Sequence, residues 1–408
     1  MNSVMTKLSR DTMRIYNQKL VLKLIKERGP LSKTQLSKMT ELTVPSVTDI
    51  LSELETYQLI ENIGQTKSKR GRYPSLHKVN ASTLNVIGVT IGSVSIRSGI
   101  CDLDGKIHSI QSIPLPDDPS PEKVLSIVVS MIDQYKQSPA TIYGIGVGMH
   151  GIVDPLEGVA VYPPHLNWDH FDFAHHLEEA TSLPVLMDND CNTLALAERW
   201  FGKGQGTLSS IILNVDYGIG AGIIVQDRLF HGVNFGGGQV GHTIVAENGP
   251  KCVCGNYGCL ETLASEPSIT KETITMAKKG FPTILKEWKP DLDTVTIDDI
   301  YKACGAGDKL AIEVIERAGR YVGIAISTIV NLFNPGKIIL TGGILQAQDD
   351  FFQPMKENVF NYSLKTNTKD LILIPSTLGV DSDVIGAASL WVNEVLTGDM
   401  SLGIILGQ

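Results

Sequence analysis

The chain has 408 residues, of which 42% are hydrophobic and 19% charged, and its formal net charge is −9. This length predicts two or three domains, and the composition excludes a fibrous, disordered or disulfide-rich class. Because no apolar run is long enough to span a bilayer and the N-terminus lacks a secretory pattern, we expect a cytoplasmic protein without membrane insertion.

The charge is unevenly distributed along the chain. Residues 1–80, called the head below, contain 14 Lys and Arg against 7 Asp and Glu, whereas the remainder, called the body, is strongly acidic. A basic head on an acidic body indicates a polyanionic partner for the head alone. A solvated charged face is the alternative interpretation.

The head reads as three helices. Apolar residues at helical spacing run up to Gly29-Pro30, and a short helix follows Ser32 as its N-cap. The next helix follows Thr43, with a proline tolerated in its first turn and a buried apolar stripe behind it. Two short helices joined by a tight turn predict a helix-turn-helix. Its recognition helix would present small side chains to the major groove: Val44, Pro45, Ser46 and Thr48.

The segment "ENIGQTKSKRGRYPSLHKVN" after the third helix is typical of the hairpin wing of a winged helix. Its glycines permit tight turns and its basic residues gather at the tip. Arg-Gly-Arg on a thin loop suits the narrow minor groove of A·T-rich DNA. We therefore expect DNA contacts from Lys69, Arg70 and Arg72. A flexible basic linker, or a winged helix that binds protein, is the alternative.

From residue 85 the pattern changes to strands followed by glycine-rich turns, as in "VIGVTIGS", "YGIGVGMHG", "LNVDYGIGAG" and "IILTGG". Strand-turn-strand units that recur with helices between them predict two related α/β halves. Backbone N–H groups in such turns often hold phosphate, although each turn taken singly is weak evidence.

The stretch "GHTIVAENGPKCVCGNYGCLE" holds three of the six cysteines and a histidine. Three thiolates and one imidazole form a closed tetrahedral set for a structural Zn²⁺ ion, with no ligand position left for water. Buried free thiols are the alternative. We predict a zinc site without metal catalysis, held by His242, Cys252, Cys254 and Cys259.

The segment "CVCGNYGCLE" also matches the zinc motif Cys-x-Cys-Gly-x-x-Gly-Cys-x-Glu of the ROK family (repressors, open reading frames, kinases). "GGQVGH" lies where that family carries Gly-Glu-x-Gly-His, and "DNDCN" where it carries a sugar-binding Asn and a catalytic Asp. The chain resembles the regulatory branch of this family, which has a basic winged helix in front.

The resemblance implies a winged helix-turn-helix followed by a two-lobed, actin/hexokinase-like (ribonuclease H-like) α/β body. The expected domains are residues 1–80 for DNA binding, 81–195 for the first lobe and 196–408 for the second. The second lobe would hold the zinc loop and the dimerisation helices, with a C-terminal end able to pack back on the first lobe.

The resemblance also implies a sugar site in the cleft of the body. Asp190, the base in the kinases, would accept hydrogen bonds from sugar hydroxyls, or would simply cap a helix. Gln239 and His165 stand where the family commonly has a Glu and an Asn, which suits an acidic or phosphorylated sugar. The expected ligand residues are Asn189, Asp190, Gln239, His242, Glu261, His165 and Gly151.

Thr90 stands where the kinases carry an Asp that handles Mg²⁺ and ATP phosphates. A neutral hydroxyl cannot balance metal charge, so the resemblance implies no catalysis and only a vestigial base in Asp190. We expect a sugar-responsive repressor of carbohydrate-use genes that binds operator DNA as a homodimer or tetramer. The alternatives are an active sugar kinase with a DNA-binding head, and a repressor controlled by a protein partner.

Overall fold

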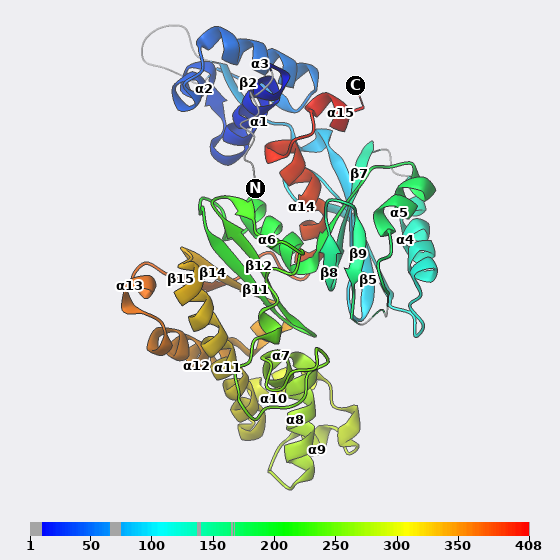
Figure 1. Cartoon of the computed structure of the whole chain (residues 1–408), viewed down its shortest axis with the longest axis vertical. Coiled ribbons are helices and arrows are strands. Elements are labelled where there is room, and N and C mark those ends of the chain that lie inside the picture. Colours follow the sequence, from blue (N-terminus) through cyan, green and yellow to red (C-terminus); the bar gives the residue numbers. More distant parts are fainter. Residues whose placement is uncertain (1–9, 66–74, 137–139, 165, 167, 408) are drawn as a thin grey trace. The chain divides into compact units, whose positions relative to one another are not determined.

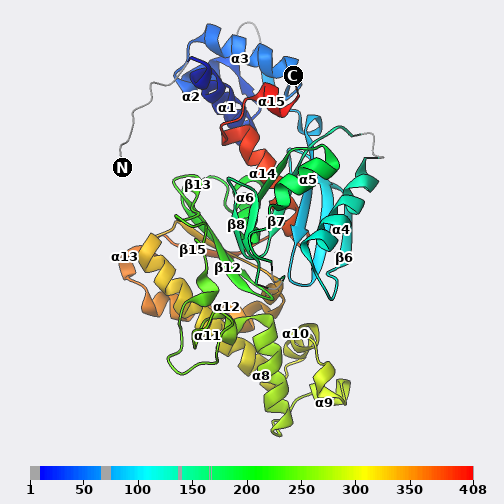
Figure 2. The ribbon, with the colours of Figure 1, turned by 45° about the vertical axis from the view of Figure 1, so that its right-hand side comes forward.

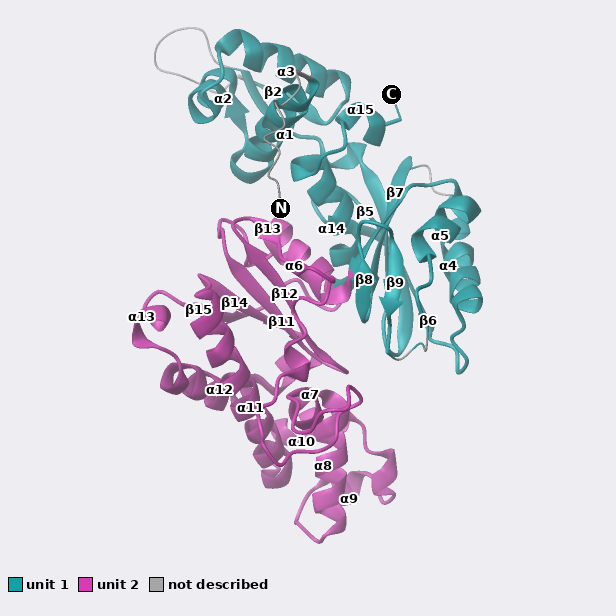
Figure 3. Cartoon of the chain, in the orientation of Figure 1, with its two compact units in different colours: residues 1–188, 383–408 teal, residues 189–382 magenta. Residues whose placement is uncertain are grey.

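The computed structural model describes residues 10–65, 75–136, 140–164, 166 and 168–407 (Figure 1). The chain divides into two compact units, residues 1–188 with 383–408 and residues 189–382 (Figure 3). The last residues of the chain therefore belong to the unit that holds the head. The sequence-based division placed the boundary between the lobes after residue 195. Lys69, Arg70, Arg72 and His165 lie outside the described residues.

In the first unit, the head consists of three helices and a small antiparallel sheet with the strand order β1-β3-β2. Ser32 starts α2 with a capping box, and Thr43 caps α3, with Pro45 in its first turn. The inward face of α3 is buried, as its periodicity predicts. The elements are α1 (Arg10–Arg28), β1 (Leu31–Ser32), α2 (Lys33–Thr40), α3 (Val44–Thr56), β2 (Ile60–Gln65) and β3 (Ser75–Val79).

The rest of the first unit is built on a five-stranded sheet with the order β10-β7-β4-β5-β6. Its strands are β4 (Asn85–Ile91), β5 (Ser95–Cys101), β6 (Ile107–Pro114), β7 (Ile142–Met149) and β10 (Val185–Asn189). A short ribbon of β8 (Ile152–Asp154) and β9 (Val159–Tyr162) follows β7. The helices are η1 (Ala81–Thr83), α4 (Pro121–Tyr135), α5 (Phe173–Thr181), α14 (Ser382–Thr397) and α15 (Leu402–Ile405).

The side-chain alternation of β4 and β7 separates two packing faces of this sheet. Ile87 and Val147 belong to the apolar core that α4 and α5 complete. Gly88 and Gly146 lie between these apolar positions and let α14 approach closely, because a Cβ atom on either would overlap a carbonyl oxygen of α14. The indole N–H of Trp391 in α14 donates to the carbonyl of Ile145 over 2.9 Å.

Replacing Gly146 with alanine should separate α14 from the sheet. The added methyl group would overlap the carbonyl oxygen of Ala387, so we expect a loss of about 2 kcal/mol of unfolding free energy in urea denaturation. Gly305→Ala is the matched control, because a Cβ there meets no described atom within 4 Å. Equal stability of the two variants would contradict this packing.

The second unit repeats the strand order of the first, as β13-β12-β11-β14-β15. In chain order both sheets read third, second, first, fourth, fifth, which confirms the prediction of two related α/β halves. The strands are β11 (Ser210–Val215), β12 (Ile219–Val225), β13 (Arg228–Leu229), β14 (Lys337–Thr341) and β15 (Ile372–Pro375).

Helix α11 buries its apolar face in the core of the second unit and packs on α7, α8, α10, α12 and α13, whereas α6 packs on β11 and β12. The helices are α6 (Asp190–Phe201), η2 (Val240–His242), α7 (Glu261–Ala264), α8 (Glu266–Lys278), α9 (Leu285–Trp288), η3 (Leu292–Thr294), α10 (Ile297–Gly305), α11 (Lys309–Phe333), η4 (Gly343–Ala347), α12 (Gln348–Tyr362) and α13 (Lys365–Thr368). Across the described ranges, every helix is too short or too polar to cross a bilayer.

Candidate functional site

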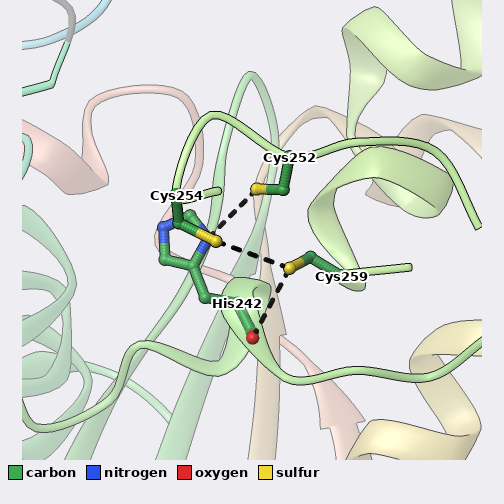
Figure 4. A group of neighbouring side chains, drawn as sticks. All are labelled: His242, Cys252, Cys254 and Cys259. Carbon is green, nitrogen blue, oxygen red and sulfur yellow. Dashed lines mark hydrogen bonds between the residues drawn. The ribbon is translucent and has the colours of Figure 1, made fainter. Parts of the chain in front are cut away.

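The four residues predicted to bind metal come together in the second unit (Figure 4). Their ligand atoms all lie within 4.8 Å of one another. Cys252 Sγ lies 3.5 Å from His242 Nδ1, and Cys254 Sγ lies 3.7 Å from Cys259 Sγ. Ligands on a tetrahedron around one zinc ion lie about 3.5–3.8 Å apart, so these two pairs have the spacing that such an ion requires and the other pairs lie within about 1 Å of it.

The loop between η2 and α7 holds these ligands by its backbone. Cys252 N–H donates to Asn256 over 2.7 Å, which closes a tight turn around Cys254. Gly258 has a positive φ of 72°, and a Cβ atom there would overlap the carbonyl of Ala246. The spacing of cysteines and glycines in the sequence thus corresponds to a wrapped loop that directs three sulfur atoms to one point.

The pKa values of the thiols in the cluster depend on how deeply each thiol is buried. It raises the pKa of Cys259 to about 12 and also raises the pKa of Cys252. Cys254 is exposed, and a hydrogen bond from the backbone of Asn256 lowers its pKa. Metal binding requires thiolates and releases their protons. The donor set of three sulfurs and one imidazole therefore fits a soft divalent cation such as Zn²⁺.

The metal loop is continuous with the residues expected to bind ligand. Gln239 directly precedes η2, which carries His242, and Glu261 begins α7 two residues after the last cysteine. Glu261 Oε2 accepts the backbone N–H of Ile219 at 3.2 Å, which ties the loop to the start of β12. A metal ion in the loop would therefore fix the positions of Gln239 and Glu261, which flank its ligands in the sequence.

Asn189 and Asp190 lie at the start of α6 in the same unit. Asn189 is the N-cap, because its side-chain oxygen accepts the N–H groups of Cys191 and Asn192 at 2.8 and 3.3 Å. Asp190 follows at the first helical position, where its Oδ1 accepts the Asn189 side-chain N–H at 2.9 Å and the Cys191 N–H. The capping role weighed for Asp190 therefore belongs to its neighbour.

Gly151 and Thr90 lie in the first unit. Gly151 follows β7 with a φ of 111°, and the preceding residue, His150, donates its backbone N–H to Ile91 at the end of β4. Thr90 is buried, and its hydroxyl donates to Asp383 Oδ2 over 3.1 Å. The sequence analysis did not foresee this carboxylate, which comes from α14.

The glycine-rich turn between β11 and β12 holds carboxylates of the chain itself. Asp216 Oδ1 accepts the N–H of Tyr217 at 2.9 Å, and Glu261 accepts that of Ile219. Beside them Glu266 is half-buried, and burial, followed by the charge of Asp216, raises its pKa to about 8. These N–H groups are therefore engaged by carboxylates, whereas a phosphate-binding turn offers them to its ligand.

Tyr301 completes this carboxyl cluster. Its hydroxyl donates to Glu266 Oε1 over 2.9 Å, and burial raises the pKa of the phenol. A groove of about 570 Å³ opens beside the cluster and is lined by residues that include Tyr217, Glu266, Lys271 and Ile274. Sequence reasoning missed Glu266 and Tyr301, although the Asp in "DYGIGAG" was a signal that this turn is unusual.

The residues expected to contact bases lie on the first turn of α3. Val44, Pro45 and Ser46 are exposed, and Thr48 is half-buried. Two of the hydroxyls are engaged locally, because Thr48 donates to the carbonyl of Val44 and Ser46 lies 2.9 Å from the Thr43 hydroxyl. The outward surface of this turn is therefore small and largely apolar.

Comparisons with known proteins identify the family of this chain. The model of the ROK family matches residues 86–394. The N-acetylglucosamine repressor of Shigella flexneri is 33% identical over 95% of this chain and 95% of its own. The xylose repressor of Bacillus subtilis is 31% identical over 93% of this chain and 96% of its own. A glucokinase of Halalkalibacterium halodurans is 32% identical over 78% of this chain and 97% of its own.

The similar solved structures likewise include a transcriptional regulator and a kinase. A ROK family transcriptional regulator, described as a homolog of the Escherichia coli MLC protein, has a TM-score of 0.86 at 30% identity and covers 98% of this chain and 100% of its own. A ROK family glucokinase from Streptomyces griseus, in complex with glucose and AMPPNP, has a TM-score of 0.69 at 25% identity and covers 75% of this chain and 98% of its own. The chain therefore belongs to the ROK family, as its cysteine, glycine and aspartate motifs predicted.

Proposed function

We propose that this protein is a sugar-responsive transcriptional repressor, with a DNA-binding head and a sugar-binding body. The extent of similarity carries this conclusion. Repressor relatives and the regulator structure match 93–98% of the chain, whereas the kinases match 75–78% of it and span nearly their own full length. The repressors thus share both head and body with this chain.

The head is proposed to be a winged helix-turn-helix. Its elements α2 and α3 are joined by three residues, and β2 and β3 form an antiparallel hairpin behind them. The exposed first turn of α3 would face the major groove, and the basic residues between β2 and β3 would enter the minor groove. Binding of two half-sites requires a homodimer or a tetramer, and a repressor of this kind acts in the cytoplasm.

The body is proposed to bind a sugar and a structural Zn²⁺ ion. His242, Cys252, Cys254 and Cys259 would hold the ion, whose chemistry is limited to fixing the loop because all four positions are filled. The sugar would contact Asn189, Asp190, Gln239, His242, Glu261, His165 and Gly151. Since Gln239 is a neutral amide, a sugar acid or sugar phosphate is the preferred class of effector.

We also propose that the body no longer transfers phosphate. Thr90 offers a hydroxyl, already bonded to Asp383, where the kinases of the family place a carboxylate. Asp216 and Glu261 accept hydrogen bonds from backbone N–H groups of the turn between β11 and β12. Their negative charge would repel a nucleoside triphosphate. Asp190 would remain as a hydrogen-bond acceptor for sugar hydroxyls.

The experiment that tests this function starts with selection of an operator from a random DNA duplex pool by the full-length protein. N-acetylglucosamine, its 6-phosphate, xylose and glucuronate are then added to the complex, each with and without Mg-ATP. We expect one sugar to change operator affinity by at least about tenfold without ATP, because allosteric coupling energies are typically about 1–3 kcal/mol.

A variant pair tests the role assigned to the wing. Arg70→Ala with Arg72→Ala should weaken operator binding by about tenfold or more and reduce its salt dependence, because each phosphate contact contributes to the salt slope. Lys302→Ala, in the body, is the control and should leave both unchanged.

Two outcomes of the sugar experiment would contradict the proposed function. Formation of ADP with any sugar would favour an active sugar kinase. Operator binding that no sugar alters would favour control by a protein partner.

A further inference from the structure

Helix α14 begins at a carboxylate that joins it to two strands of the first unit. Asp383 accepts the hydroxyl of Thr90 through Oδ2 at 3.1 Å and the guanidinium of Arg97 through Oδ1 at 2.5 Å. Thr90 in β4 and Arg97 in β5 face each other across the antiparallel pair. Both side chains of the ion pair are partly buried, at 21% and 33% exposure, so solvent screens this contact less than it screens a fully exposed salt bridge.

The middle of α14 is fixed against the sheet. Gly88 and Gly146 contact the helix backbone directly, and the Trp391 indole donates to the carbonyl of Ile145. A helix in such close contact cannot slide or rotate without a clash of backbone atoms. Helix and sheet therefore move as one body, and a shift of the sheet beside Asp383 also moves the far end of α14.

The far end of α14 lies beside α1 of the head (Figure 1, Figure 2) and is held there by a lysine of that helix. Lys19 in α1 is 3% exposed, and its Nζ donates to the carbonyl oxygens of Glu394 and Gly398 at 2.5 and 2.8 Å. The same Nζ lies 3.5 Å from Glu394 Oε1. The ammonium group thus satisfies carbonyls at the C-terminus of the helix and complements the negative end of its dipole.

Within the head, the neighbours of Lys19 lead to α3. Gln18 is also buried, and its side-chain N–H group donates to Glu53 of α3, which also pairs with Arg14. Contacts therefore run without a gap from the end of β4, through α14 and α1, to the helix assigned to the major groove. At the β4 end, the backbone of His150, beside the expected ligand residue Gly151, bonds to Ile91.

We propose that α14 mechanically couples the end of β4 to the DNA-binding head, with Thr90, Asp383 and Lys19 as its positioning residues. The coupling gives Thr90 a role of its own: its hydroxyl holds the helix where a second carboxylate would repel Asp383. The use of this coupling in DNA release rests on the proposed function, but the coupling itself is a property of the first unit.

Hydrogen–deuterium exchange of the full-length protein tests the coupling without operator or sugar. Asp383→Asn and Thr90→Val should each speed exchange of α1 amides around Lys19 by about threefold or more, since residues that carry coupling shift it by about 0.5–2 kcal/mol. Lys19→Met should in turn speed exchange in residues 86–91, because coupling is reciprocal. Thr90→Ser, which keeps the hydroxyl, should behave as the wild type.

The controls separate coupling from general loosening. Asp118→Asn changes an exposed carboxylate of the same unit and should leave both ends unchanged. The proposal is overturned if each variant alters exchange only around its own position, or if Thr90→Ser acts as Thr90→Val does. Val and Thr have the same shape, so Thr90→Val tests the hydroxyl even if Asp383→Asn fails to fold.

A second readout connects the coupling to regulation. With the selected operator and the active sugar, Thr90→Val should retain operator affinity without sugar and lose at least about half of the logarithmic change caused by sugar. Normal sugar response in a variant whose exchange coupling is lost would overturn the regulatory use of α14. Absence of any sugar response in the wild type would instead contradict the proposed function and leave the exchange result valid.

Discussion

Replacing Cys259 with serine should lower the zinc content of the purified protein from one ion per chain to nearly none and reduce the Tm by about 10 °C. The thiol is fully buried and lies 3.7 Å from Cys254 Sγ, so its loss opens the tetrahedral set. The loop between η2 and α7 would keep its backbone hydrogen bonds but lose the ion that holds its four ligand side chains together. Metal analysis by mass spectrometry and a thermal melt measure the two effects.

A second cysteine provides the control for this result. Cys304 is buried in α10 but is not part of the cluster, so Cys304→Ser should cost some packing and keep one zinc per chain. Chelation of the wild type should reproduce the melt of Cys259→Ser. A wild-type protein that contains no zinc, or a variant that retains it, would contradict the metal assignment.

Replacing Glu266 with glutamine should change how stability depends on pH. The folded pKa of Glu266, about 8, exceeds the ordinary value for a carboxyl group, mainly because of burial and then because of Asp216. Between about pH 4.5 and 8 the unfolded chain therefore binds fewer protons at this group than the folded chain, and the unfolding free energy falls as pH rises. The glutamine variant lacks this loss.

The expected difference is on the order of 2 kcal/mol at pH 8.5, after allowance for partial solvent screening of a half-buried group. At pH 5 the two proteins should have similar stability, because the carboxyl is then protonated in the native state. Urea unfolding at both pH values measures the difference. Glu357→Gln, at an exposed position of α12, should show no such dependence. A constant offset between Glu266→Gln and the wild type would contradict the assigned pKa.

The sequence predicted those features of the fold and the site that are determined by residues close together in the chain. The caps at Ser32 and Thr43, the repeated strand-turn-strand units and the cluster of one histidine and three cysteines follow from short-range spacing, because turns and helix starts are encoded within a few residues. The cysteine set could be identified since three of its members lie within eight residues.

Contacts between distant segments could not be predicted in this way. Thr90 meets Asp383 and Lys19 meets Glu394 only because α14 returns to the first sheet and to the head. Glu266 meets Tyr301 through the packing of α8 on α10. The members of each pair are far apart in the sequence and share no recognisable motif. A single sequence therefore gives no indication that they form a hydrogen bond.

The discontinuity of the first unit has a consequence for biosynthesis. Residues 383–408 pack against the sheet and the head, yet the ribosome makes them only after all of residues 189–382. At about 5–20 residues per second, α14 follows β10 by roughly 10–40 seconds. During that interval the nascent head lacks the helix that Lys19 contacts, and the second unit is able to fold first. A chain truncated before residue 383 would therefore lack every contact that α14 makes with the sheet and with Lys19.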